Sequence, residues 1–286
     1  MLEKLFQKYW RIRIYNNYKK NTLKIFLNNI ISFCKKNLLK KNIGEMPFKY
    51  FFIKRRKLIK KFCKENLIDI DNQNIKTYFN YYLDSSLINK KSVIYSFGLA
   101  TNIKFEEHLV RAKGVGVYCY DPTPVSINYM KQINNPNIIY KPFGIWIEDK
   151  KMKFYSAHTE SEKNWGGSIL ETYGTGGSRE YLQCYKLKTL MNSNNHKKID
   201  VLKLDIEGVA TEVLNDIFND KIFPQQIAVE FEVTEDDNIN KNIFKSKSDD
   251  ILKILNRMKL MGYKIYHMPR FSNLPYSSIE VLCIKK

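Results

Sequence analysis

From residue 92 onward, short apolar runs alternate with amphipathic segments, which is the pattern of an open α/β sheet. The apolar runs that predict core strands lie at residues 92–98, 114–121, 137–146, 199–205 and 225–233. Another run, at residues 151–157, predicts an added edge strand or hairpin. The larger part of the chain is therefore expected to form one sheet with helices between its strands.

The C-terminal part predicts a helix followed by two strands. Ile251, Ile254 and Leu255 recur at helical spacing, and Gly262 predicts the point where this helix stops. The apolar runs at residues 263–268 and 277–285 have no helix between them, so we expect an antiparallel hairpin at one edge of the sheet. The predicted fold class is α/β, with a mostly parallel sheet and an antiparallel C-terminal hairpin.

The N-terminal region differs in pattern and in charge. Apolar residues recur at helical spacing among many cations, and Gly44 and Pro47 mark a break between two helical segments. Residues 1–66 hold 19 Lys and Arg against 3 Asp and Glu, whereas residues 92–286 hold 26 against 23. We therefore predict a basic, mainly helical region over residues 1–90 and a nearly neutral α/β domain over residues 91–286.

Three arrangements suit the basic region, residues 1–66, in which lysines are interleaved with aromatic side chains. It can form amphipathic helices on an anionic membrane surface, a phosphate-binding face for RNA, or a helical subdomain with its lysines in solvent. The pattern alone leaves the three open.

Several protein classes are disfavoured. The cysteines are odd in number and scattered, without a CxxC motif, which argues against a disulfide scaffold or a structural zinc site. The 4 histidines are isolated, so a histidine-rich metal centre is not expected. The sequence shows neither an apolar run of membrane-spanning length nor the apolar core of a signal peptide. The expectation is a soluble, cytoplasmic protein.

The segment from Val93 to Leu109 reads as a strand, a turn at Gly98 and a helix, which is the arrangement that seats nucleotide-like cofactors. Asp121 ends the next strand, at roughly the spacing of an acid that binds a ribose. A single glycine suits a cofactor without a pyrophosphate, and so S-adenosylmethionine rather than NAD. The alternative is that Gly98 merely ends a strand and Asp121 begins an Asp-Pro turn.

Six stretches carry a more specific resemblance. They are YSFGLATNIKFEEHL, GVGVYCYDPTPVS, KPFGIW, KLKTLM, IDVLKLDIEGVATEVL and IAVEFE, within residues 92–285. Together they resemble the FkbM-type family of S-adenosylmethionine-dependent methyltransferases. The resemblance implies a Rossmann-like class I methyltransferase fold, S-adenosylmethionine as cofactor, and O-methylation of hydroxyls on sugars or secondary metabolites.

The resemblance also suggests a cofactor site. The turn formed by Phe97, Gly98, Leu99 and Ala100 would hold the methionine part, with a polar contact from Asn102. Asp121 would bind the ribose hydroxyls, and Pro122 and Thr123 would flank the adenosine. Ala100 stands where relatives often have a second glycine, Asn102 where they often have an acid, and Glu232 where they commonly have a histidine.

The catalytic candidates are acidic residues at strand ends. Asp205 and Glu207 can both face the methyl-transfer site, where one can act as general base. Together with Glu230 they can instead hold a divalent cation that acidifies the acceptor hydroxyl. The alternative for Glu207 is a first-turn anion of the following helix. His158, in a polar insert, is a further candidate base, or simply a solvated loop residue.

The sequence therefore predicts an O-methyltransferase acting on a sugar hydroxyl, in capsule or other surface-polysaccharide biosynthesis. Its acceptor would be a carbohydrate or sugar nucleotide, and residues 1–66 would bring it to the inner face of the membrane. Two alternatives stay open: an RNA methyltransferase that uses the basic arm, and a non-catalytic scaffold or sugar-binding relative. The near-neutral charge of residues 92–286 counts against nucleic acid.

Overall fold

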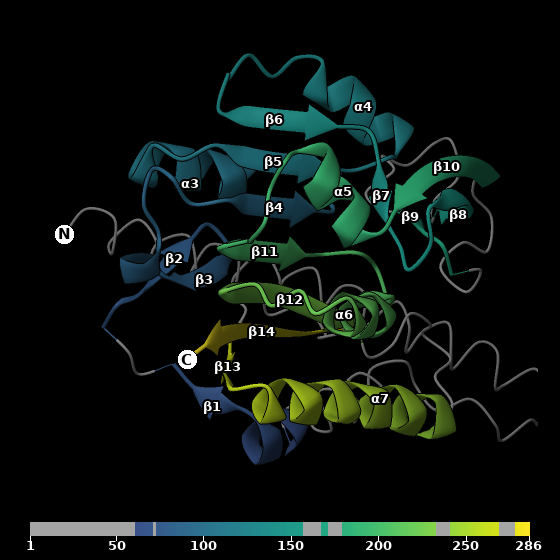
Figure 1. The fold of residues 1–286 in the computed structure, drawn as a ribbon. Helices are drawn as coiled ribbons and strands as arrows, with labels where there is room; N and C mark the ends of the chain where they lie inside the picture. Colours follow the sequence, from purple (N-terminus) through teal and green to yellow (C-terminus); the bar gives the residue numbers. More distant parts are fainter. Residues whose placement is uncertain (1–60, 71–72, 157–166, 171–178, 233–240, 269–277) are drawn as a thin grey trace, which may run out of the picture. The chain divides into compact units, whose positions relative to one another are not determined.

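The computed structural model describes residues 61–70, 73–156, 167–170, 179–232, 241–268 and 278–286. These residues contain an eight-stranded sheet with the strand order β1-β13-β14-β12-β11-β4-β5-β6 (Figure 1). In that order the strands are β1 (Ile68–Asp69), β13 (Tyr263–His267), β14 (Ser278–Lys285), β12 (Gln226–Glu232), β11 (Val201–Leu204), β4 (Ile94–Phe97), β5 (Val117–Tyr120) and β6 (Ile138–Lys141).

The sheet is mostly parallel. Strands β12, β11, β4, β5 and β6 pair parallel to one another, and β14 runs antiparallel to both β12 and β13. The predicted fold class, including the antiparallel C-terminal pair, is thus confirmed. One difference is that β1 pairs with β13, so β13 is not the outermost strand.

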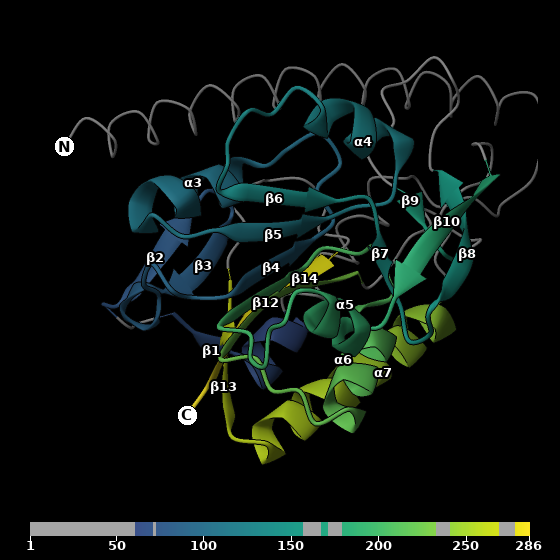
Figure 2. The same cartoon turned by 45° about the horizontal axis from the view of Figure 1, so that its top comes forward.

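The central strands are buried along their whole length, which explains their continuous apolar runs. Every residue of β4, β11 and β12 is buried, as is usual for parallel strands covered by helices on both faces. Helices α6 (Ala210–Asn219) and α7 (Lys241–Leu260) contact each other and pack on β12 and β13, and α3 (Lys104–Lys113) packs on β5 and β6. In Figure 2, α5 (Leu187–Ser193) lies close to α6, and α4 (Pro124–Met130) lies beyond β6.

Two of the sequence predictions need correction in detail. Residues 137–146 were predicted as one strand, but they form β6 and the short β7 (Gly144–Ile145), with Pro142 between them. Proline has no N–H to donate to a sheet, so β6 ends there. The C-terminal helix, predicted from the spacing of Ile251, Ile254 and Leu255, begins earlier, at Lys241, and ends before Gly262 as predicted.

A second, four-stranded sheet has the order β7-β10-β8-β9. Its strands β8 (Lys150–Ser156) and β10 (Arg179–Tyr185) pair antiparallel, and β9 (Gly167–Ser168) pairs with β8. The strand predicted at residues 151–157 therefore belongs to this sheet and does not extend the main one.

A hairpin precedes the first central strand. Its strands β2 (Ile75–Tyr78) and β3 (Tyr81–Asp84) pair antiparallel, and β3 packs on β12 and β14. The hairpin belongs to the same compact unit as the sheet, which comprises Cys63–Phe271 and Ser277–Lys286. Residues 1–60 lie outside the described residues, so the helical character of that part stays a prediction. Residues 75–84, which the prediction assigned to the N-terminal region, form the hairpin of the sheet unit. Among the described helices, none combines the length and apolar character that crossing a membrane requires.

Candidate active site

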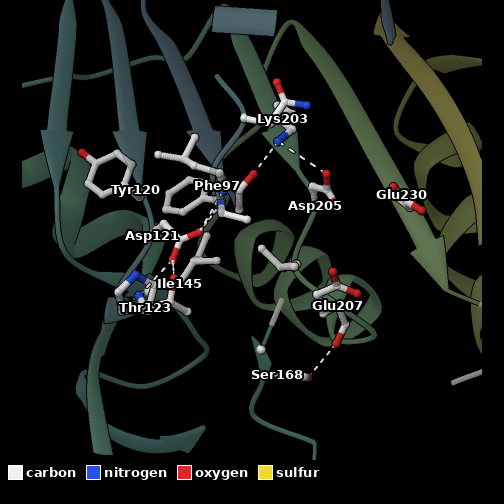
Figure 3. Close-up of a pocket in the computed structure, with 18 of the residues that line it drawn as sticks. Phe97, Tyr120, Asp121, Thr123, Ile145, Ser168, Lys203, Asp205, Glu207 and Glu230 are labelled. Carbon is white, nitrogen blue, oxygen red and sulfur yellow. Dashed lines mark hydrogen bonds and ion pairs between the residues drawn. The ribbon is translucent and has the colours of Figure 1, made fainter. Parts of the chain in front are cut away.

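A cavity of about 440 Å³ lies at the carboxyl ends of β4, β5, β11 and β12 (Figure 3). This is where ligands bind in open α/β sheets, and the volume lies within the usual range for small-molecule sites. All eight residues proposed for the cofactor line the cavity, together with three of the four catalytic candidates: Phe97, Gly98, Leu99, Ala100, Asn102, Asp121, Pro122, Thr123, Asp205, Glu207 and Glu230. The fourth candidate, His158, lies outside the described residues.

The turn after β4 needs a glycine at position 98. Gly98 has a φ of +81°, and a Cβ built on it would lie 1.7 Å from the backbone oxygen of Asp205. Both the left-handed backbone and the contact with the end of β11 therefore exclude any other residue. Ala100 is also left-handed, with a φ of 47°. An alanine can adopt this conformation at a cost of about 1 kcal/mol.

Asp121 holds the glycine turn in place. Its Oδ2 accepts hydrogen bonds from the backbone amides of Leu99 and Ala100, each 2.9 Å long. Its Oδ1 accepts from the amide and the hydroxyl of Thr123, at 2.9 and 2.5 Å. These four bonds fill the roughly four acceptor sites of a carboxylate. In this state Asp121 orders the turn, and its contact with a ribose stays a prediction.

Asp205 is oriented by two residues from different parts of the chain. Its Oδ2 accepts a 2.7 Å hydrogen bond from the hydroxyl of Tyr81, in the β2–β3 hairpin. The ammonium of Lys203 lies 3.6 Å from the same oxygen and donates a 2.6 Å hydrogen bond to the carbonyl of Gly98 (Figure 3). The carboxylate of Asp205 is thus fixed beside the turn that is proposed to hold the cofactor.

The protonation states of these neighbours follow from their surroundings. Burial alone would lower the pKa of Lys203, but the carboxylates of Asp205 and Glu106 outweigh it and raise that pKa above its ordinary value. Lys203 is therefore a cation. Burial, reinforced by the charge of Asp205, raises the pKa of the Tyr81 hydroxyl well above its ordinary value. Tyr81 therefore stays a hydrogen-bond donor.

Glu106, from α3, is a buried acid at the inner end of the cavity. It is fully buried and accepts a hydrogen bond from the Ser96 hydroxyl. Burial raises its pKa, although Lys203 acts in the opposite direction. The arrangement places an acid and a lysine together beneath the glycine turn.

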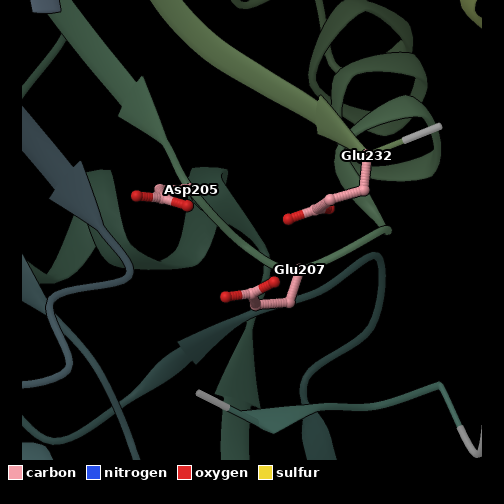
Figure 4. Close-up of side chains that lie close together, drawn as sticks. All are labelled: Asp205, Glu207 and Glu232. Atoms are coloured by element: carbon pink, nitrogen blue, oxygen red, sulfur yellow. The ribbon is translucent and has the colours of Figure 1, made fainter. Parts of the chain in front are cut away.

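Asp205 and Glu207 lie near a third acid, Glu232, which also lines the cavity. Carboxylate oxygens of these three residues lie within 4.8 Å of one another, and Figure 4 shows the side chains directed toward a common centre. Burial raises the pKa of Glu232 well above its ordinary value, and the neighbouring Glu207 raises it further. Glu230, the third acid named from the sequence, lines the same cavity but does not belong to this group.

Glu207 does not occupy the first turn of a helix, which was the alternative considered for it. Helix α6 begins at Ala210, and Glu207 lies in the preceding turn with a left-handed φ of 49°. The hydroxyl of Ser168, from β9, donates a 2.6 Å hydrogen bond to its carbonyl. The turn and this contact place the Glu207 side chain on the cavity.

Sequence reasoning missed three residues of the site. Tyr81 belongs to a hairpin that was not predicted, and Glu106 lies in the predicted helix after Gly98 but was not named as a site residue. Glu232 was noted only as a departure from the family pattern. Strand alternation could have found it, because residues two positions apart on a strand face the same side, and Glu230 was already a candidate.

Comparisons with known proteins bear on this site. A scan of protein families matches residues 88–265 to the methyltransferase FkbM domain. A search of curated proteins found no match.

Among solved structures, the fold is similar to that of a fibrillarin pre-rRNA processing protein from Methanococcus jannaschii, with a TM-score of 0.41 and 14% identity, over 74% of this chain and 70% of that one. It is also similar to magnesium protoporphyrin IX methyltransferase from Synechocystis PCC 6803, with a TM-score of 0.37 and 11% identity, over 93% and 96% of the two chains. For precorrin-6y C5,15-methyltransferase from Geobacter metallireducens the TM-score is 0.37 and the identity 9%, over 77% and 97%.

Proposed function

The chain belongs to the FkbM family of methyltransferases, and from this premise we propose that it transfers a methyl group from S-adenosylmethionine to a hydroxyl of a sugar. The observation that supports the proposal is that the Gly98 turn, Asp121 and Asp205 all line the same cavity. These elements meet at the ends of adjacent parallel strands, where an open α/β sheet binds its ligand.

In this proposal the cofactor occupies the side of the cavity formed by β4 and β5. Its methionine part lies against the turn from Phe97 to Ala100, near Asn102. Its adenosine lies beside Asp121, Pro122 and Thr123. S-adenosylmethionine carries a positive charge on its sulfur, and a cavity lined by several carboxylates favours a cation.

The reaction is an in-line displacement. The bond between sulfur and the methyl carbon breaks as the bond between that carbon and the acceptor oxygen forms, and S-adenosylhomocysteine leaves with both electrons of the broken bond. The hydroxyl proton passes to a carboxylate of the protein, for which Asp205 and Glu207 are positioned at the cavity. The cofactor supplies the reactive methyl group, and the protein's contribution is orientation and proton removal.

The sugar acceptor follows from the family resemblance. We place the protein in the synthesis of capsule or other surface polysaccharide, in the cytoplasm. Its basic residues 1–66 would hold it at the anionic inner face of the membrane, where sugar precursors are assembled. The acceptor would be a carbohydrate or a sugar nucleotide.

Calorimetric titration with S-adenosylhomocysteine tests the cofactor site. We expect binding in the micromolar range, and its loss in Asp121→Ala, because the alanine releases the amides of Leu99 and Ala100 from the turn. Glu148→Ala, an exposed substitution away from the cavity, should leave the affinity unchanged. No binding to the folded protein would overturn the proposal and favour the non-catalytic relative.

The acceptor class is tested separately. The protein is incubated with S-adenosylmethionine labelled in its methyl group, in parallel with sugar nucleotides, surface polysaccharide and total RNA. Label in the sugar fractions that is stable to mild base indicates an O-methyl ether and supports the proposal. Label in RNA alone would overturn the sugar assignment and favour the RNA methyltransferase.

A further inference from the structure

The group formed by Asp205, Glu207 and Glu232 brings three carboxylates together from two neighbouring strands. Asp205 and Glu207 follow β11, and Glu232 ends β12, which pairs with β11 in parallel register. Each residue offers one oxygen, and these oxygens lie within 4.8 Å of one another (Figure 4). An ion with bonds of about 2.1–2.4 Å places its ligand atoms no further apart than about 4.2–4.8 Å. The spacing therefore fits oxygens around a single ion.

Glu232 supplies a second and independent observation. Its side chain is buried, with 8% exposure, and is directed at Asp205 and Glu207 (Figure 4). Its Oε2 has no hydrogen-bond partner within the part of the chain that the structure describes. Buried carboxylate oxygens normally have partners, so an unpaired one that faces two other carboxylates is suited to accept a cation as its partner.

The nearby lysine does not fill this role. Lys203 donates its hydrogen bond to the carbonyl of Gly98, and the carboxylate that it approaches is that of Asp205, at 3.6 Å. Glu230 also lines the cavity and adds further negative charge. The end of the cavity near Glu207 and Glu232 thus has an excess of anionic groups.

We propose that Asp205, Glu207 and Glu232 bind one divalent cation of the hard, oxygen-preferring class, such as Mg²⁺, Mn²⁺ or Ca²⁺. All three donors are carboxylates, with neither nitrogen nor sulfur among them, and this selects against zinc and copper. The proposal replaces Glu230 of the sequence-based candidate set by Glu232. Tyr81 orients one ligand, through its hydrogen bond to Asp205.

The catalytic part of this inference rests on the proposed function, whereas cation binding does not. A cation at this position lies in the same cavity as the proposed methyl donor. It can bind the acceptor hydroxyl directly, lower the pKa of that hydroxyl and orient its oxygen toward the methyl carbon. The proton then leaves to solvent or to a neighbouring carboxylate as the methyl group is transferred.

Titration of the full-length protein with MgCl₂, MnCl₂ and CaCl₂, without cofactor, tests the site. Calorimetry should show one site for at least one of the ions, and the electron paramagnetic resonance signal of free Mn²⁺ should fall by the same stoichiometry. Glu232→Gln should weaken binding by at least about tenfold, because it removes a charged ligand. Glu230→Gln, on the same strand and lining the same cavity, should weaken binding clearly less than Glu232→Gln does, because it removes a neighbouring charge but no ligand.

Thermal unfolding separates lost cation binding from lost stability in the variants. The wild-type midpoint should rise when the cation is added, since a ligand that binds only the native state stabilises it. Glu232→Gln should unfold without cation at a temperature no lower than wild type, because the amide does not repel the neighbouring carboxylate of Glu207, and should not respond to the cation. Absence of binding by all three ions, or equal binding by wild type and Glu232→Gln, would overturn the proposal. Titration with S-adenosylhomocysteine on the same samples separates that outcome from failure of the proposed function.

Discussion

Tyr81 is the residue that most directly links the hairpin to the chemistry of the site. Its hydroxyl donates to Asp205, 124 positions away along the chain. Its ring packs against that of Phe105 and lies 5.2 Å from the ammonium of Lys203. Tyr81 thus acts through Asp205 as a positioning residue, and it lies outside residues 88–265, which match the family.

Tyr81→Phe removes the hydrogen bond to Asp205 and retains the ring. We expect kcat to fall about tenfold, because the carboxylate is then oriented by Lys203 alone. The affinity for S-adenosylhomocysteine should be unchanged, and the free energy of unfolding should fall by about 1–2 kcal/mol. Steady-state kinetics, calorimetry and chemical denaturation measure the three quantities.

The matched control is Tyr78→Phe, in the same hairpin. Tyr78 donates a 3.0 Å hydrogen bond to the Ser85 hydroxyl and does not line the cavity. The Tyr78→Phe variant should lose a similar free energy of unfolding and keep the kcat of the wild type. Equal loss of kcat in both variants would show that Tyr81 contributes to folding only.

The residues of the site differ in how far the sequence predicted them. Gly98, Asp121 and Asp205 each end a predicted strand, so the sheet itself brings them to one edge. The hydrogen bonds of Asp121 to the Gly98 turn could not be predicted, because they depend on the backbone conformation of Leu99 and Ala100. Tyr81 could not be predicted either, since no local pattern relates it to Asp205.

At the scale of elements, the strands that the sequence predicted are those with continuous apolar runs. Strands β4, β11 and β12 are buried throughout, so burial alone makes their sequences recognisable. The β2–β3 hairpin consists of two four-residue strands, IKTY and YYLD, which are too short and too mixed to show a period. Packing of β3 on β12 and β14, and of β2 on α3, holds the hairpin in place.

Leu83→Ala tests the contribution of that packing. Leu83, in β3, has 0% exposure and belongs to the main hydrophobic core. The alanine should lower the free energy of unfolding by about 2–5 kcal/mol, from lost burial and the cavity left behind. Chemical denaturation measures the change. Lys76→Ala, at an exposed position of β2, serves as control and should cost less than about 0.5 kcal/mol. A small effect of Leu83→Ala would mean that the hairpin is not needed for the stability of the sheet.

At the scale of the whole molecule, the charge is divided sharply along the chain. The net charge is +19, and residues 92–286, with 26 basic against 23 acidic residues, contribute little of it. Each basic residue near an anionic bilayer contributes about 1 kcal/mol to binding. Association with a membrane would therefore depend on the N-terminal region.

Neutralising residues 54–57, Lys-Arg-Arg-Lys, by glutamine tests this dependence in the full-length chain. Partition onto vesicles that contain phosphatidylglycerol should weaken at least about tenfold. Sedimentation with the vesicles measures it, and neutral phosphatidylcholine vesicles should bind neither protein. The control neutralises four exposed lysines of the α/β domain, namely Lys150, Lys151, Lys188 and Lys197. Equal partition of both variants would contradict a membrane role for this segment, and a loss of RNA binding instead would favour the RNA methyltransferase.

The position of β14 determines when the active site can be completed during synthesis. β14 follows β13 in the chain but lies between β12 and β13 in the sheet. Until the ribosome has added Ser278–Lys285, β12 has an unpaired edge, and Glu230 and Glu232 lack their neighbours Glu280 and Ser278. A nascent chain that has reached only β13 exposes a long apolar strand edge, which is a typical binding site for chaperones and a starting point for aggregation. The cofactor turn at β4 can therefore form before β14 is synthesised, whereas the surroundings of Glu230 and Glu232 are completed only afterwards.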